Sequence, residues 1–446
     1  MKKPYVLIAI LTMLLLVTAC PGPDNDDSPD PTIEYPTASF SYKCDDCRIG
    51  DTVQFTSSSS KAETFDWDFG DGNSSQEENP EHVYTVMGTY TVQLTVSNED
   101  GSDDLSKSVS IKGPPGLLVD AVVYSPGLEG NLLGDSPYRN VTIYLPPGYE
   151  SSAKRYPVVY LLHGFYGDNT CSFGTGLCNN RYPKINLEPV LEDLINAGTI
   201  EPMIVVAPDA RNRFEGSWYL NSASSGNWED FIVEDVVQFV DENYRTLPSS
   251  ESRGIAGFSV GGYGAVWIAM RHADVFSAVY AKGASILAFS LPELNDGLRK
   301  MYEEILAATE IDDFDQLPDN AKEHVSLSVA VIPNPSAPPF YCDYIYDYAS
   351  DQLVDSTVQK CWKFDPYTSI STYEDNLLQL SAILLDCGDQ EWNLTVNTTF
   401  SEGLAEIGIE NTLITFEGDH GDKDIERLRD KAFPMFSEHL VHEGKK

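Results

Sequence analysis

The residues best suited to covalent chemistry stand in one glycine-rich stretch, Gly254 to Gly264. A short apolar run leads into Gly257-x-Ser259-x-Gly261, and small helix-forming residues follow it. Strand, sharp turn and helix in this order expose a serine at the edge of a sheet, and glycines flank the serine because the turn presses the backbone against neighbouring strands. We therefore predict that Ser259 is a nucleophile.

A serine hydroxyl needs a base to take its proton, and the base needs a carboxylate to orient it. In α/β-hydrolases the acid and then the histidine follow the serine in the chain, each after a strand. His420, which closely follows an apolar run, is the predicted base. Glu391 is the favoured acid, because the acid usually stands three residues after the glycine that ends its strand. Asp389 and Asp386 stay open as alternatives.

An acyl-transfer intermediate also needs two backbone N–H donors for its oxyanion. One is predicted at Val260, directly after the nucleophile, and the other at Phe165, in the loop after His163-Gly164. This chemistry requires no cofactor, and none is predicted. No metal site is predicted either, because Cys44-x-x-Cys47 lacks a second pair of ligands.

The elements that must position these residues are near-continuous apolar runs with amphipathic stretches between them. Such runs are typical of a parallel sheet covered on both faces, so we predict a doubly wound α/β domain over residues 117–446. The expected strands are Val158–Leu162, Met203–Ala207, Gly254–Gly257, Ser277–Lys282, Ala382–Cys387 and Thr412–Glu417. The expected helices are Leu187–Ala197, Trp228–Tyr244, Gly262–Arg271, Leu394–Ile407 and Asp424–Leu440.

One long interval, at about residues 285–378, interrupts this alternation and is predicted to be a cap beside the active site. Its aromatic-rich part offers Tyr341 and Tyr344 as stacking surfaces for a sugar or phenolic ring. Trp218 and Tyr219 could line the same cleft, with core packing as an equal alternative.

Residues 33–112 alternate polar and apolar side chains in short runs, which predicts a small all-β, immunoglobulin-like sandwich. This segment resembles the PKD (polycystic kidney disease) family through Phe65-Asp66-Trp67-Asp68-Phe69-Gly70-Asp71-Gly72 and Gly88-Thr89-Tyr90-Thr91-Val92. The resemblance implies a spacer or a polymer-contacting module without chemistry of its own. Residues 113–116 are predicted to be a linker to the second domain.

Several motifs of the second domain together resemble the esterase D family. They are Tyr160-Leu161-Leu162-His163-Gly164, Ser217-Trp218-Tyr219, Trp228-Glu229-Asp230-Phe231, Gly257-Phe258-Ser259-Val260-Gly261 and Gly418-Asp419-His420. That family includes feruloyl and acetylxylan esterases, S-formylglutathione hydrolases and mycolyltransferases. The resemblance implies an α/β-hydrolase fold and carries the nucleophile, acid and base roles to Ser259, Glu391 and His420. Many members have Asp where this chain has Glu391.

The first twenty residues predict export. Two lysines precede an apolar run that is too short to span a bilayer, and the run ends in Val17-Thr18-Ala19-Cys20, which resembles a bacterial lipobox. We expect acylated Cys20 to anchor the protein in the bacterial envelope, with residues 21–32 as a disordered acidic tether. Exposure on the surface of the outer membrane is one location that such an anchor allows.

The cysteines of an exported chain are expected to pair. Three pairs that are local in sequence are predicted: Cys44 with Cys47, Cys171 with Cys178, and Cys342 with Cys361. Cys387 is expected to stay a buried thiol.

Charge narrows the range of partners. With 29 basic and 69 acidic residues the formal net charge is −40, and no basic stripe is present, so nucleic acid is not expected as a partner. The sequence favours a serine esterase that removes feruloyl or acetyl groups from plant polysaccharide or its oligosaccharides. The alternatives are an acyltransferase on the same fold and a non-catalytic, glycan-binding surface protein.

Overall fold

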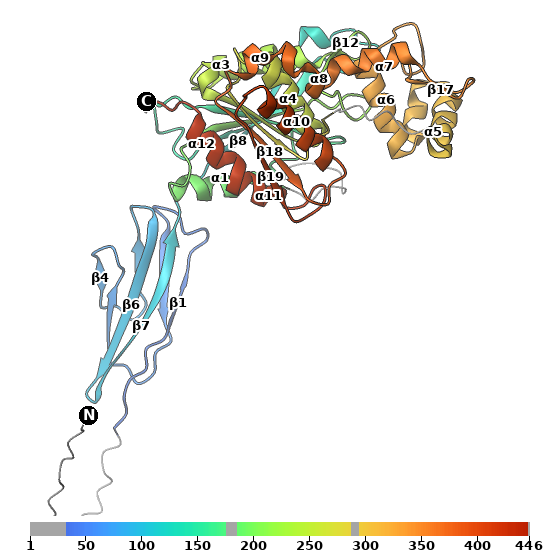
Figure 1. The fold of residues 1–446 in the computed structure, drawn as a ribbon. Helices are drawn as coiled ribbons and strands as arrows, with labels where there is room; N and C mark the ends of the chain where they lie inside the picture. The colour runs from blue at the N-terminus through green and yellow to red at the C-terminus, as the bar shows by residue number, and fades with distance from the viewer. Residues whose placement is uncertain (1–32, 175–184, 287–293, 445–446) are drawn as a thin grey trace, which may run out of the picture. The chain divides into compact units, whose positions relative to one another are not determined.

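The computed structural model describes residues 33–174, 185–286 and 294–444. These residues form two compact units (Figure 1). The first contains the chain up to Asp45 with Thr52–Val83 and Thr89–Val109, and the second contains Asp46–Asp51, Tyr84–Gly88 and everything from Ser110 onward. The predicted signal segment with Cys20, the tether and Cys178 lie outside the described residues. In the part described, no helix is both long and apolar enough to cross a membrane.

The first unit is a pair of antiparallel sheets, as the alternating pattern predicted. One sheet has the order β1 (Phe40–Lys43), β2 (Thr52–Ser57), β5 (Glu81–Val83), and the other β4 (Ser74–Ser75), β3 (Thr64–Asp68), β6 (Gly88–Asn98), β7 (Gly101–Ile111). Side chains of alternate residues, such as Val92, Leu94 and Val96, are buried between the sheets.

The signature residues of this unit form its core and a turn. Trp67 is fully buried, and its indole N–H donates to the carbonyl of Glu77 at 2.9 Å. The ring of His82 stacks on Phe69 with centroids 4.1 Å apart, and its Nε2 lies 2.8 Å from a carboxylate oxygen of Asp71. The described contacts of Asp71 and His82 are therefore those of a packed turn.

The second unit is built on a mixed, mostly parallel sheet in the order β19-β18-β15-β14-β10-β11-β9-β8. Its central strands agree with the predicted ones and run parallel: β10 (Val158–Leu162), β11 (Ile204–Pro208), β14 (Arg253–Phe258), β15 (Ala278–Lys282), β18 (Ala382–Gly388) and β19 (Thr412–Phe416). Antiparallel β9 (Tyr138–Leu145) and β8 (Leu117–Tyr124) extend one edge, and neither was among the predicted strands. This arrangement confirms the predicted α/β-hydrolase sheet.

Helices cover both faces of the sheet, so alternate residues of one strand enter different cores. Val158 and Tyr160 of β10 pack into one core and Val159 into the other. The first core is covered by α2 (Trp228–Asp230), the π-helix η2 (Phe231–Val236), α3 (Val237–Asn243), α4 (Val260–Arg271) and α10 (Leu394–Glu406). The second is covered by α1 (Leu187–Asn196), η7 (Leu428–Ala432) and α12 (Phe433–His439), and α11 (Asp424–Arg427) directly precedes η7.

The long interval between β15 and β18 contains helices and a hairpin; its first helices and the hairpin lie to one side of the sheet, whereas its last helices lie over the sheet (Figure 1). It comprises α5 (Asp296–Ala307), η4 (Ile311–Gln316), α6 (Asp319–Val331), β16 (Tyr346–Asp347), β17 (Gln352–Leu353), α7 (Asp355–Cys361), η5 (Trp362–Phe364), α8 (Pro366–Ser369), η6 (Ile370–Thr372) and α9 (Glu374–Leu377). We call the part from α5 to β17 the cap. Its own apolar cluster includes Tyr302, Phe314 and Phe340.

The aromatic stretch of the cap packs inward. Tyr341 and Tyr344 are only partly exposed and lie against the cap's apolar cluster, where the rings of Tyr344 and Tyr302 are 5.6 Å apart. Part of each ring is therefore used in the packing of the cap, because a small lobe needs its largest apolar rings for its core. That the exposed parts stack on a sugar or phenolic ring stays a prediction.

The prediction of a Cys342–Cys361 disulfide is wrong, because both residues are free, buried cysteines. Cys342 belongs to the cap's cluster, whereas Cys361, at the end of α7, packs into the core of the sheet. Burial raises the pKa of each thiol to about 12. Cys44, Cys47 and Cys171 are disulfide-bonded, and Cys387 is the expected buried thiol.

These assignments predict the pattern of thiol alkylation. In protein lacking residues 1–20 and never reduced, Cys342, Cys361 and Cys387 should resist iodoacetamide until the chain is unfolded, because a buried, protonated thiol is a poor nucleophile. Peptide mass spectrometry should then find all three labelled. A cross-linked peptide joining Cys342 to Cys361 would contradict the structure.

Candidate active site

The predicted nucleophile lies on a strained turn between β14 and α4. Ser259 has φ 57° and ψ −119°, a conformation that L-residues adopt only where the surrounding structure enforces it. The turn is possible because its flanking residues are glycines: a Cβ on Gly257 would lie 2.0 Å from the carbonyl oxygen of Gly261. A Cβ on Gly261 would lie 2.3 Å from the carbonyl oxygen of Leu162. This is the geometry of a nucleophile elbow.

The predicted acid and base lie at the ends of β18 and β19. His420 Nδ1 lies 2.8 Å from Glu391 Oε2, and Glu391 Oε1 accepts a hydrogen bond from the N–H of Gly388 at 2.7 Å. Burial favours the neutral form of Glu391, but the hydrogen bonds from His420 and Gly388 and the nearby positive charge of Lys282 outweigh it. The pKa of Glu391 is therefore lowered, and the carboxylate stays ionised beside the imidazole.

The two alternative acids have other partners. Asp389 is exposed and accepts a hydrogen bond from the N–H of Gly418 at 3.1 Å. Asp386 is fully buried within β18, where Arg427 donates to both of its oxygens at 2.8 and 2.9 Å and the hydroxyl of Tyr280 donates at 2.9 Å. In the described structure only Glu391, of the three candidates, contacts His420.

Gly283, which sequence reasoning did not single out, makes room for the Glu391–His420 pair. It follows β15 with φ +49°, and a Cβ there would lie 2.5 Å from Glu391 Oε2 and 3.1 Å from His420 Nδ1. Two buried asparagines hold this turn, since Asn393 donates to the carbonyls of Gly283 and Ala284 and Asn397 donates to that of Ala284. Asn393 and Asn397, four residues apart at the start of α10, were the available signal.

Ser259 and His420 follow β14 and β19 at the same edge of the sheet, without a hydrogen bond between them among the described contacts. The ring of Phe258, adjacent to Ser259, lies 4.7 Å from the ring of His420. The neighbour of Ser259 Oγ is Ser285 Oγ at 3.5 Å. Catalytic hydrogen bonds are often loose in structures without substrate, so this geometry is compatible with proton transfer once an ester is bound.

The loop that carries Phe165 lies against the nucleophile. A Cβ on Gly164 would lie 3.5 Å from Ser259 Cβ, and Val260 is the first residue of α4, where backbone N–H groups have no partner within the helix. His163 stiffens the loop: the N–H of Ala210 donates to its Nε2 at 3.0 Å, so Nδ1 carries the proton and donates to the carbonyl of Gly164 at 2.9 Å. Burial lowers the pKa of His163 and keeps this neutral form.

Trp218 and Tyr219 belong to the core, which was the second of the two predicted alternatives. They are 2% and 1% exposed. The hydroxyl of Tyr219 donates to the carbonyl of His163 at 2.7 Å, which adds support to the oxyanion loop. Both residues, and Tyr166 in that loop, have positive φ angles. Several strained residues thus surround the site, as is common where function demands a particular backbone.

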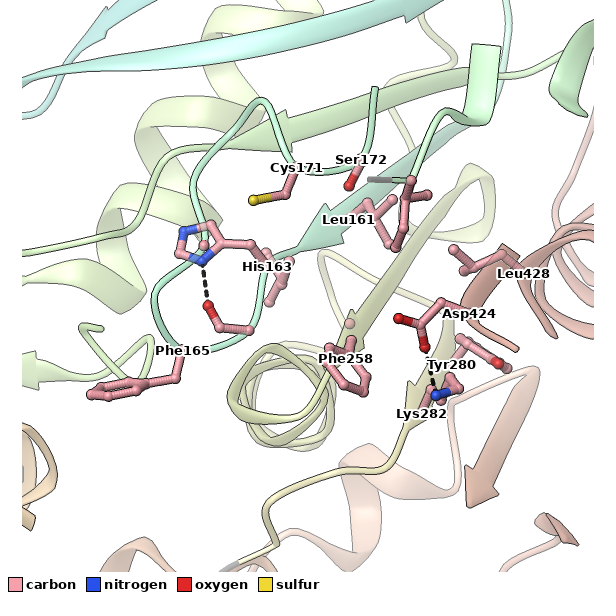
Figure 2. A pocket seen from close by; sticks show the side chains of 15 residues that line it. Leu161, His163, Phe165, Cys171, Ser172, Phe258, Tyr280, Lys282, Asp424 and Leu428 are labelled. Atoms are coloured by element: carbon pink, nitrogen blue, oxygen red, sulfur yellow. Dashed lines mark hydrogen bonds and ion pairs between the residues drawn. The ribbon is translucent and has the colours of Figure 1, made fainter. Parts of the chain in front are cut away.

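A cavity of about 60 Å³ lies beside the elbow (Figure 2). Its wall is mainly apolar and includes His163, Phe165 and Phe258. Lys282 and Asp424, both almost fully buried, form an ion pair of 2.6 Å at its side. No cluster of three or more potential metal ligands occurs among the described residues.

Comparison with known families agrees with this geometry. The model of the family described as "Putative esterase" matches residues 137–402, which include Ser259 and Glu391 and end before His420. The chain belongs to this esterase family. A PKD domain matches residues 34–112, which confirms the assignment of the N-terminal unit.

Individual relatives match parts of this chain. The chain is 32% identical over 142 residues to Esterase Rv1288 of Mycobacterium tuberculosis, and the match covers 31% of this chain and 27% of that protein. The chain is also 31% identical over 144 residues to an endo-1,4-beta-xylanase/feruloyl esterase of Xylanibacter ruminicola, and this match covers 31% of the chain and 18% of the relative. The chain thus spans about a quarter or less of these relatives. A solved ferulic acid esterase is 22% identical with a TM-score of 0.49, over 74% of this chain and all of the other.

Adding one methyl group at Gly283 should disable the esterase. In Gly283→Ala the new Cβ would displace Glu391 or His420, and such a misplacement should lower kcat about 10²-fold. Gly408→Ala is the matched control, because Gly408 also has positive φ (+82°) but has open space around its Cα. The control should lose stability only, as measured by thermal unfolding. Equal kcat values for the two variants would contradict this role for Gly283.

The acid can be identified with two isosteric variants. Glu391→Gln keeps the shape but removes the charge that orients and stabilises the imidazolium, so kcat should fall by about 10³-fold or more. Asp389→Asn should stay within about threefold of the parent, because its side chain is exposed and distant from the imidazole hydrogen bond. Steady-state kinetics on p-nitrophenyl acetate would check both. The reverse order of effects would transfer the role to Asp389.

Proposed function

We propose that this esterase hydrolyses carboxylic esters through an acyl-enzyme on Ser259. The observation that carries the proposal is the 2.8 Å contact between Glu391 and His420 at the strand ends next to the strained Ser259 elbow. A carboxylate, an imidazole and a serine on a strained elbow supply a nucleophile and its base without a cofactor.

The reaction follows from the positions of these groups. Ser259 Oγ attacks the ester carbonyl and gives its proton to Nε2 of His420, while Glu391 holds Nδ1–H and stabilises the imidazolium. The N–H groups of Val260 and Phe165 receive the oxyanion. His420 then protonates the departing alcohol, and water, activated by the same imidazole, releases the acid.

The proposed substrates are feruloyl or acetyl esters of plant polysaccharide or its oligosaccharides. Support comes from the relatives, one of which is named as an endo-1,4-beta-xylanase/feruloyl esterase, and from the PKD domain, which suits a protein that works on a polymer. Acyl transfer to another alcohol would pass through the same acyl-enzyme and is the alternative outcome of its breakdown. Export and acylation of Cys20 remain predictions of the sequence.

The proposal is tested with protein lacking residues 1–20 on p-nitrophenyl acetate and methyl ferulate. The parent should hydrolyse at least one of them, and Ser259→Ala should reduce the rate by about 10³-fold or more, because no other hydroxyl is placed on the elbow. The ratio of the two rates distinguishes a short acyl pocket from a phenolic one. A parent that is inactive on both, or a rate that survives the substitution, would favour a non-catalytic, glycan-binding protein.

A further inference from the structure

One face of the cap helix α6 is directed at the active-site loops. Asp319, Glu323 and Ser326 share this face, because residues three and four apart lie above one another on a helix. The hydroxyl of Tyr166 donates to Asp319 Oδ1 at 2.8 Å. Seven residues along, Ser326 Oγ donates to the carbonyl of Gly216 at 2.7 Å.

These two contacts determine where Glu323 lies. Both ends of the face are tied to loops of the hydrolase, one of them directly after the predicted oxyanion donor Phe165. Glu323 stands between the two ties and therefore faces the same side. Its side chain is exposed, and no hydrogen bond or ion pair to it occurs among the described contacts.

The electrostatic surroundings of Glu323 place it near the catalytic base. Desolvation by neighbouring groups raises the pKa of its carboxyl, and the charge of Asp319 adds to this rise, whereas His420 opposes it. The charge of His420 thus reaches the Glu323 carboxyl, which stands on the face of α6 that contacts the loops at Tyr166 and Gly216. A free carboxylate at this position is available to a bound ligand.

The chemistry of ester cleavage indicates which part of the substrate comes near Glu323. The departing alcohol must lie beside His420, because that imidazole gives it a proton, while the acyl oxygen points toward the N–H groups of Val260 and Phe165. A group next to the base therefore meets the alcohol half of the ester.

We propose that Glu323 is a specificity-determining residue that binds hydroxyl groups on the alcohol part of the substrate. This inference rests on the proposed esterase function. A carboxylate is acceptor-only and can receive two hydroxyl donors, as a vicinal diol of a sugar provides, whereas it repels an anionic alcohol and gains nothing from a simple alkyl group. The preferred ester is therefore one of a neutral, polyhydroxylated alcohol.

The test compares esters that share one acyl group and differ only in the alcohol. Methyl ferulate and feruloyl arabinose form one pair, and methyl acetate and monoacetyl xylose the other; the pair with the faster acyl group is used. Glu323→Gln should lower kcat/KM for the sugar ester about tenfold, which is the effect of losing a hydrogen bond to a charged group. The same variant should leave kcat/KM for the methyl ester within about twofold of the parent value. Glu323→Ala should lower kcat/KM for the sugar ester at least as much as Glu323→Gln.

Glu406→Gln is the charge-matched control. Glu406 is an exposed residue at the end of α10. Its substitution should leave the ratio of kcat/KM for the sugar ester to kcat/KM for the methyl ester unchanged. An unchanged ratio in both Glu323 variants would overturn the inference. So would an equal loss on both esters, since that would show an effect on the base and not on the alcohol. Failure of the esterase proposal is seen separately, as parent activity that Ser259→Ala does not abolish.

Discussion

The 2.8 Å contact between Glu391 and His420 is the interaction on which the site depends, and it exists because a third strand leaves room for it. Three adjacent parallel strands, β15, β18 and β19, end at the same edge of the sheet. The turn after β15 passes so close to the pair that only a glycine fits at position 283. Asn393 and Asn397 hold that turn through its carbonyls. The acid and base are thus positioned by groups that take no part in the chemistry.

The same edge of the sheet concentrates strain and buried charge. Ser259 has a positive φ angle, and so do Tyr166 and Tyr219 in the loops beside it. These conformations persist because buried hydrogen bonds, such as that from the Tyr219 hydroxyl to the carbonyl of His163, are satisfied only in this arrangement. The ion pair of Asp386 with Arg427 lies under the site and ties β18 to α11, the helix that follows the His420 loop.

The cap adds a second lobe to this rigid base. Phe214 of a hydrolase loop packs into the cap's aromatic cluster, and the cap helix α6 contacts the hydrolase loops at Tyr166 and Gly216. The proposed catalytic groups follow strands of the sheet, whereas Glu323 stands on the cap, on the face of α6 that contacts the hydrolase loops. The two proposals thus assign chemistry and substrate selection to different parts of the chain, which is compatible with one hydrolase sheet serving many esters.

The sequence alone predicted the parallel strands of the sheet, the elbow at Ser259 and the position of His420 after a strand, because these depend on local patterns: apolar runs, glycines at fixed offsets and the order of residues along the chain. It favoured Glu391 over Asp389 only by its spacing from a glycine. Tertiary structure decided that Glu391 contacts the imidazole, that Gly283 must lack a side chain, and that Cys342 and Cys361 enter different cores. It also turned the cap tyrosines inward and placed Glu323 near His420. These outcomes depend on which side chains from distant segments meet, and spacing along one chain does not contain that information.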